Sequence, residues 1–191
     1  MIIHPNKLTI IRIIVVPLIA LCFLWDFQYS NWVCWGLFTI AGITDFFDGY
    51  LARKYQLESK LGAFLDPVAD KMIVVLCLVL LVSSLHILEN TLSNILFICA
   101  VIIIIGREVL VSALREWMAA QGKRDSVAVS FVGKWKTTAQ MIAIGGLLLR
   151  DPVFGLPILQ MSELLLYIAA ILTLWSMVIY LSAAWNDLLE K

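Results

Sequence analysis

Long apolar segments separated by short polar ones make up most of this 191-residue chain. About 20 apolar residues suffice for a helix to cross a bilayer, so each long segment can form one transmembrane helix. The pattern predicts an all-α, polytopic membrane protein of a single domain, residues 1–191, with a short amino-terminal interfacial segment. Six transmembrane helices are expected, at about 10–28, 31–53, 62–86, 93–119, 131–149 and 158–185.

The composition supports this interpretation. Hydrophobic residues make up 62% of the chain and charged residues 15%, whereas a soluble domain is about half apolar and a quarter charged. We therefore expect an integral membrane protein that contacts lipids and binds no nucleic acid. The formal net charge is zero, so the positions of the charges carry more information than their sum.

Basic residues near the predicted loops fall almost entirely on one side of the membrane, and Arg150 alone falls on the other. By the positive-inside rule the basic side is cytoplasmic, and an even number of helices then places both termini there. Tryptophans, which favour membrane interfaces, agree with this orientation. The basic residues are Lys7, Arg12, Arg53, Lys54, Lys60, Lys123, Arg124, Lys134 and Lys136; the tryptophans are Trp25, Trp32 and Trp35 outside and Trp117, Trp135 and Trp185 inside.

A few polar residues precede and enter the first apolar segment. Pro5 and Asn6 indicate a turn before the first helix. Asn6, Thr9 and Arg12 follow one another at intervals of three, which would place them on one side. Their simplest interpretation is a helix cap with an interfacial anchor.

Four carboxylates lie next to the predicted second and third helices. Asp45 and Asp48 are three residues apart, and Asp66 and Asp70 are four apart, so each pair projects from one helix face. Because Pro67 follows Asp66, the third helix either begins there with Asp66 as its N-cap or is kinked there. An aspartate in a membrane helix costs roughly 2.5 to 3.5 kcal/mol, and no cationic partner is evident, so a divalent cation, or two, is the simplest compensation. Oxygen ligands without nearby His or Cys favour Mg²⁺, Mn²⁺ or Ca²⁺.

Small residues lie one turn from the acids and leave room beside a metal for a bulky, flat group. Arg53 adds a cation suited to phosphate. Between Asp45 and Asp70 the pattern is D-x2-D-G-x2-A-R-x8-G-x3-D-x3-D, which resembles the signature of the CDP-alcohol phosphatidyltransferases at every fixed position. The small residues of the pattern are Gly49, Ala52 and Gly62.

A second, basic group lies within residues 106–138. It comprises Arg107 and Arg115 on the fourth predicted helix and Lys134 and Lys136 at the start of the fifth. A cationic cluster opposite an acidic metal site suggests a pocket for a second, phosphorylated substrate.

Two other interpretations of this basic group remain open. Interfacial Arg and Lys commonly extend toward anionic lipid headgroups, which would account for Arg115 and both lysines. Arg107 could instead pair with Glu108 or Glu116, although Glu108 is its neighbour in sequence and is expected to point elsewhere.

The stretches REVLVSALREWMA and GKRDSVAVSFVGKWKTTAQM resemble one branch of the family, the phosphatidylglycerophosphate synthases. The start PNKLTIIR is similar to the family's amino-terminal pattern, in which Asn and Thr approach the nucleotide. Together with the signature, the resemblance covers most of the first five predicted helices and does not extend to the sixth.

The resemblance implies transfer of a phosphatidyl group from CDP-diacylglycerol to the 1-hydroxyl of sn-glycerol 3-phosphate, with release of CMP, at the cytoplasmic face of a bacterial inner membrane. It also implies Mg²⁺ or Mn²⁺, as two ions, and a homodimer. Asp70 would be the catalytic base. The metal ligands would be Asp45, Asp48, Asp66 and Asp70; the nucleotide-binding residues Asn6, Thr9, Gly49, Ala52, Arg53 and Gly62; and the acceptor-phosphate residues Arg107, Arg115 and Lys134.

Three alternatives remain at this stage. The same family chemistry could use another acceptor, such as serine, an inositol phosphate or phosphatidylglycerol. The acids could be the ion or proton relay of an ion-coupled transporter, which is a common role for intramembrane acids. A purely structural membrane protein would have no use for four costly acids.

Overall fold

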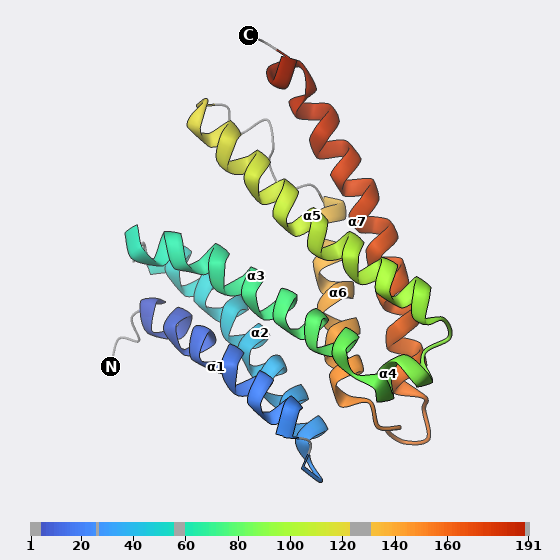
Figure 1. Ribbon diagram of the computed structural model, residues 1–191. Helices are drawn as coiled ribbons and strands as arrows, with labels where there is room; N and C mark the ends of the chain where they lie inside the picture. The colour runs from blue at the N-terminus through green and yellow to red at the C-terminus, as the bar shows by residue number, and fades with distance from the viewer. Residues whose placement is uncertain (1–4, 26, 56–59, 123–130, 190–191) are drawn as a thin grey trace.

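The computed structural model describes residues 5–25, 27–55, 60–122 and 131–189, and their side chains at 10–25, 27–45, 65, 67–122 and 135–185. In this part of the chain the prediction of an all-α fold is confirmed, since no strand accompanies the helices beyond one isolated bridge. Successive long helices run in opposite directions between two ends of the molecule (Figure 1). The helices are α1 Pro5–Trp25, α2 Ser30–Tyr55, α3 Lys60–Ser83, α4 Leu85–Asn90, α5 Asn94–Ala120, α6 Phe131–Leu149 and α7 Ile158–Leu189.

The observed helix starts correct one prediction and exclude one alternative. Helix α1 begins at Pro5, so the turn expected there is wrong. Proline lacks an N–H, and at the first position of a helix that N–H would have no intrahelical partner, so the ring is tolerated there. Helix α3 begins at Lys60 and continues through Pro67, so Asp66 is not its N-cap.

The short helix α4 was not predicted, because its first residues were expected to end the third helix. The chain leaves helical geometry at Ser84, whose backbone is extended. The preceding Ser83 directs its hydroxyl to the carbonyl of Leu80 at 2.8 Å. Serine side chains compete in this way with helix continuation. At the start of α5, Ser93 is the N-cap and its side chain accepts from the N–H of Leu96.

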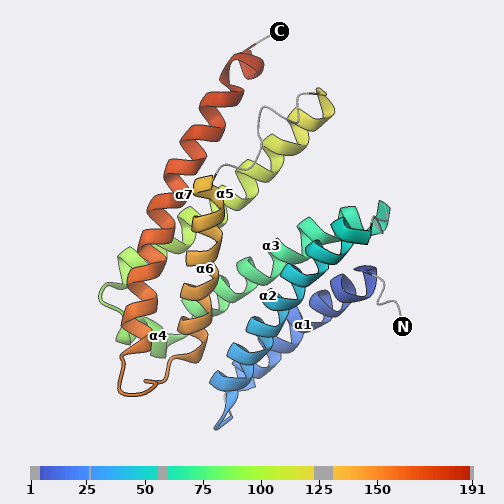
Figure 2. The same cartoon turned by 180° about the vertical axis from the view of Figure 1, so that it is seen from behind.

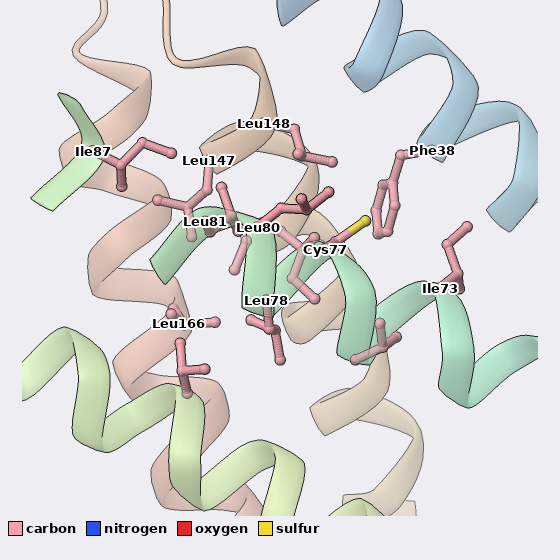
Figure 3. Packing of buried hydrophobic residues seen from close by; sticks show 14 of the residues in the cluster. Phe38, Ile73, Cys77, Leu78, Leu80, Leu81, Ile87, Leu147, Leu148 and Leu166 are labelled. Carbon is pink, nitrogen blue, oxygen red and sulfur yellow. The ribbon is translucent and has the colours of Figure 1, made fainter. Parts of the chain in front are cut away.

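The long helices form two groups, α1–α3 and α5–α7, and α2 and α3 of the first group pack against α5 and α6 of the second (Figures 1 and 2). The apolar core lies where the groups meet, toward the end that carries α4. It includes Cys77, Leu78 and Leu81 of α3, Leu147 of α6 and Leu166 of α7, all fully buried (Figure 3). Toward the opposite end the two groups diverge, and the polar clusters described below lie outside this core.

The surface is that of a membrane protein. Among the described residues, two helical segments are long and apolar enough to cross a bilayer: Asn94–Ala120, with a mean hydropathy of 2.5, and Ile158–Trp185, with 2.3. Large apolar side chains such as Leu24, Ile95 and Ile171 are well exposed. Soluble monomers rarely expose such extensive apolar surface.

Candidate functional site

Helix α1 turns Arg12 toward the inside of the protein. Arg12, Val16, Ile19 and Phe23 follow at intervals of four, three and four, so they share the face of α1 that packs against α2 and α3. All four are buried, Arg12 with only 2% of its surface exposed. The interpretation of Arg12 as an interfacial anchor is therefore wrong, because its position in the apolar stripe directs it inward.

The Arg12 guanidinium joins two of the predicted site acids. Its Nη1 donates to Oδ1 of Asp45 on α2 at 2.5 Å and also to Oδ1 of Asp70 on α3. Each carboxylate side chain is 47% exposed, whereas that of Arg12 is 3% exposed. The expected convergence of acids from two helices is thus observed for this pair. The expectation that the acids lack a cationic partner is wrong, since Arg12 serves both; these three residues are called the acid cluster below.

The remaining predicted residues of the signature and the amino-terminal pattern lie on described helices, but their side chains fall outside the described ones. The predicted metal and nucleotide roles of these residues therefore stay predictions. They are Asn6, Thr9, Asp48, Gly49, Ala52, Arg53, Gly62 and Asp66, together with Lys134 of the acceptor-phosphate set. Among the side chains that are described, no three His, Cys, Asp or Glu residues form a group that could hold a metal.

A buried ion pair crosses between α5 and α6. Oε1 of Glu108 accepts from Nη1 of Arg107 at 3.0 Å and from Nζ of Lys136 at 2.6 Å. The Lys136 side chain is 2% exposed and that of Arg107 is 10% exposed. Glu108 therefore points toward its sequence neighbour, contrary to expectation, and Lys136 does not extend to the headgroups. Among the described side chains, one carboxylate lies between two cations, which leaves an excess of positive charge here.

Tyr180 of α7 contacts two arginines of α5, Arg107 and Arg115. The hydroxyl of Tyr180 accepts from Nη2 of Arg115 at 2.8 Å. The guanidinium carbon lies 5.0 Å from the ring centroid for Arg115 and 5.7 Å for Arg107. Both distances lie within the range of attraction between a cation and an aromatic face. We call Arg107, Glu108, Arg115, Lys136 and Tyr180 the basic cluster.

Adjacent residues of α3 connect the two clusters. Asp70 belongs to the acid cluster, and the next residue, Lys71, donates from Nζ to the hydroxyl of Ser112 on α5. Ser112 lies one turn after Glu108, on the same face of α5. A pocket of about 290 Å³ opens between α3 and α5 at this point, and its polar lining is Lys71, Glu108, Ser112 and Glu116.

The acid cluster has the chemistry of a divalent-cation site. Asp45 and Asp70 present oxygen atoms to one point, and a cationic group already occupies that point. Oxygen donors are the ligands that Mg²⁺ and Mn²⁺ prefer. The residues present therefore fit such an ion, provided that the guanidinium gives way to it.

Two residues of these clusters could have been found from the sequence, and one could not. Arg12 continues the spacing of apolar residues along α1, and Glu108 lies where the buried stripe of α5 would continue between Ile104 and Val111. Polar residues at such positions are buried and need partners. Tyr180 lies in an apolar segment with no distinguishing spacing, and only the packing of α5 on α7 brings it to the arginines.

The sequence is similar to known proteins over almost its full length. A family model described as CDP-alcohol phosphatidyltransferase matches residues 2–175. A Haemophilus influenzae protein named CDP-diacylglycerol--glycerol-3-phosphate 3-phosphatidyltransferase is 48% identical over 98% of this chain and 96% of its own length. A protein of the same name from Yersinia enterocolitica is 48% identical over 97% of this chain and 97% of its own length. Another, from Salmonella choleraesuis, is 46% identical over 98% of this chain and 97% of its own length.

Proposed function

The chain belongs to the CDP-alcohol phosphatidyltransferase family, and we propose that it transfers the phosphatidyl group of CDP-diacylglycerol to sn-glycerol 3-phosphate. The products are CMP and phosphatidylglycerol phosphate, so the protein is an enzyme of phosphatidylglycerol synthesis. The observation that carries this proposal is the complete acidic signature between Asp45 and Asp70, in a chain that matches enzymes of this named activity from end to end. The meeting of Asp45 and Asp70 at one cation supports it.

The acids would hold Mg²⁺ or Mn²⁺, as two ions. Asp45, Asp48 and Asp66 would act chiefly as ligands, and Asp70 would contribute a further oxygen. When bound, the ions would neutralise charge on the diphosphate and on the departing CMP. Gly49, Ala52, Arg53 and Gly62, with Asn6 and Thr9 of α1, would line the nucleotide site.

The reaction would be a direct displacement. The 1-hydroxyl oxygen of glycerol 3-phosphate forms a bond to the phosphatidyl phosphorus, and the bond from that phosphorus to the CMP oxygen breaks. Asp70 would accept the proton of the attacking hydroxyl. CMP leaves with the electron pair of the broken bond. Because the acceptor hydroxyl attacks the phosphorus itself, we expect no covalent intermediate on a Ser, Cys or His side chain.

The basic cluster would bind the phosphate of the acceptor. Among the described residues, Arg115 has no carboxylate within ion-pair distance, and Arg107 and Lys136 share a single carboxylate, that of Glu108. A guanidinium engages phosphate through two parallel N–H bonds. Arg107, Arg115 and Lys134 are the proposed contacts, and Lys136 lies near Arg107 because both donate to Glu108. An acceptor without phosphate, such as serine, would leave this charge unused.

The active site would face the cytoplasm of a bacterial cell, within the inner membrane. Six helices, α1, α2, α3, α5, α6 and α7, would cross the bilayer, with both termini cytoplasmic. The distribution of basic residues and the alternating helix directions support this arrangement (Figures 1 and 2). A homodimer is proposed from the family resemblance alone.

The proposal is tested by incubating the purified protein with CDP-diacylglycerol, Mg²⁺ or Mn²⁺ and a panel of acceptors, and by following CMP release. We expect release with glycerol 3-phosphate, and little with serine, inositol phosphate or phosphatidylglycerol. If the protein preferred another acceptor, the proposed acceptor substrate would be wrong, but the proposed phosphatidyl transfer would still hold. Ion uptake into vesicles without CMP release from any acceptor would favour the transporter alternative instead.

A further inference from the structure

Tyr180 is a buried phenol held in place by apolar contacts. It is 3% exposed and lies in a small core between α5 and α7, separate from the main one, with Val111, Leu114, Met118 and Ala184. Close packing leaves such a ring few alternative positions. Its hydroxyl is therefore presented to Arg115 from a fixed point.

The ring is the feature that Arg107 and Arg115 share. These residues are eight apart on α5, or roughly 12 Å along the helix axis at 1.5 Å per residue. Both guanidinium carbons nevertheless lie within 5.7 Å of the Tyr180 centroid. The electron-rich face attracts both cations, so it brings together two groups that would otherwise repel one another.

Arg115 retains most of its hydrogen-bonding capacity. A guanidinium has five N–H donors. Among the described residues, Arg115 donates through Nη2 to Tyr180, while its Nε is buried without a hydrogen-bond partner. Nε of Arg107 is likewise buried and unpartnered within the described part of the chain. Arg115 has unused donors and, among the described residues, no carboxylate within ion-pair distance, so it is suited to an anion from outside the protein.

We propose that Tyr180 is a positioning residue for the acceptor's phosphate, acting through Arg115 and Arg107. The inference rests on the proposed function, and it assigns to α7 a role in substrate selection, although the motifs in the sequence that resemble the family do not extend to this helix. Tyr180 itself does not touch the reacting atoms. It holds both guanidinium groups within 5.7 Å of one ring centroid, and from there they would donate to the acceptor's phosphate.

The test is the variant Tyr180→Phe, which keeps the ring and removes only the hydroxyl. We expect the KM for glycerol 3-phosphate to rise about tenfold, since a hydrogen bond to a charged group is lost. The KM for CDP-diacylglycerol should stay within about twofold. Tyr167→Phe removes a phenolic hydroxyl from the same helix, one that donates to Glu163, and it is the matched control: it should not change the ratio of the two KM values.

A double-mutant cycle with Arg115→Lys provides the second measurement. If Tyr180 acts through Arg115, the effects of the two substitutions on the KM for glycerol 3-phosphate will not add. Protection against thermal unfolding by glycerol 3-phosphate, measured on the same proteins without donor, should weaken in Tyr180→Phe and persist in Tyr167→Phe.

The outcomes separate the two proposals. If the parent enzyme is active and Tyr180→Phe changes neither KM, or changes both KM values equally, the positioning role of Tyr180 is overturned. The proposed function is then unaffected. Additive effects in the cycle also overturn the positioning role. A parent protein that releases no CMP with glycerol 3-phosphate, under conditions where it does so with another acceptor, overturns the choice of acceptor instead.

Discussion

The variant Arg12→Gln should destabilise the metal-free protein, because Arg12 forms ion pairs with both Asp45 and Asp70. Removing one partner of a buried ion pair costs about 3 to 5 kcal/mol. The two carboxylate side chains are 47% exposed, so water replaces part of the lost interaction, and we expect about 1 to 2 kcal/mol. For a chain of this size each kcal/mol shifts the Tm by about 2 to 4 °C. The Tm in EDTA should therefore fall by roughly 2 to 8 °C.

Divalent metal should reverse this loss. In the parent protein an ion bound by Asp45 and Asp70 must displace the Arg12 guanidinium, whereas in Arg12→Gln it need not. Ligand at 100 times its Kd stabilises a protein by about 2.7 kcal/mol, and this stabilisation should be reached at a lower Mg²⁺ or Mn²⁺ concentration in the variant. The assay is thermal unfolding in detergent, across a metal titration that begins in EDTA.

Arg150→Gln is the matched control for this experiment. Arg150 lies at the far end of α6 and stacks over the Phe23 ring at 4.4 Å, so its loss should lower the Tm without changing the response to metal. Two results would refute the reasoning for Arg12: an unchanged Tm in EDTA, or a metal titration that is the same in the variant and the parent. Either would mean that Arg12 does not compete with the ion for the carboxylates.

Three further predictions follow from the proposed function. Arg115→Ala should raise the KM for glycerol 3-phosphate by about 30- to 1000-fold, which corresponds to roughly 2 to 4 kcal/mol for a charged contact, and should change the KM for CDP-diacylglycerol little. Small and equal changes in both KM values, measured by steady-state kinetics, would instead favour a role of Arg115 as an anchor to lipid headgroups. EDTA should abolish CMP release, and Asp45→Asn should lower it by orders of magnitude while circular dichroism stays helical; full turnover without divalent metal would exclude the metal role. In a cysteine-free background, a cysteine at Asn90 should react with an impermeant thiol reagent in intact cells and one at Gln121 should not; the reverse pattern would invert the topology.

The positions of the long helices could be predicted because they depend on local properties. Apolar length locates α5 and α6 to within a residue or so of their observed bounds, since a lipid-facing helix satisfies its backbone hydrogen bonds internally. The boundaries that were wrong lie at Pro5 and Ser84. Each depends on a single residue, Pro or Ser, that is compatible with more than one local conformation.

Spacing along the chain was sufficient to identify the acidic signature and the family chemistry that it implies. It placed Asp45 and Asp70 on helix faces that could meet, and they do meet. It did not identify what stands between them, because the pairing of Arg12 with two acids depends on the packing of α1 against both α2 and α3.

The sequence by itself therefore determined the helical class, the approximate helix bounds and the acidic signature of the family, since these follow from hydrophobicity and from periodicity within single helices. Tertiary structure alone decided the partners: Arg12 with two aspartates, Glu108 with Lys136, and Tyr180 with two arginines. The physical reason is that a buried charge must be neutralised by groups within a few ångströms. Which groups come that close depends on how separate helices pack, and no spacing within one helix encodes it.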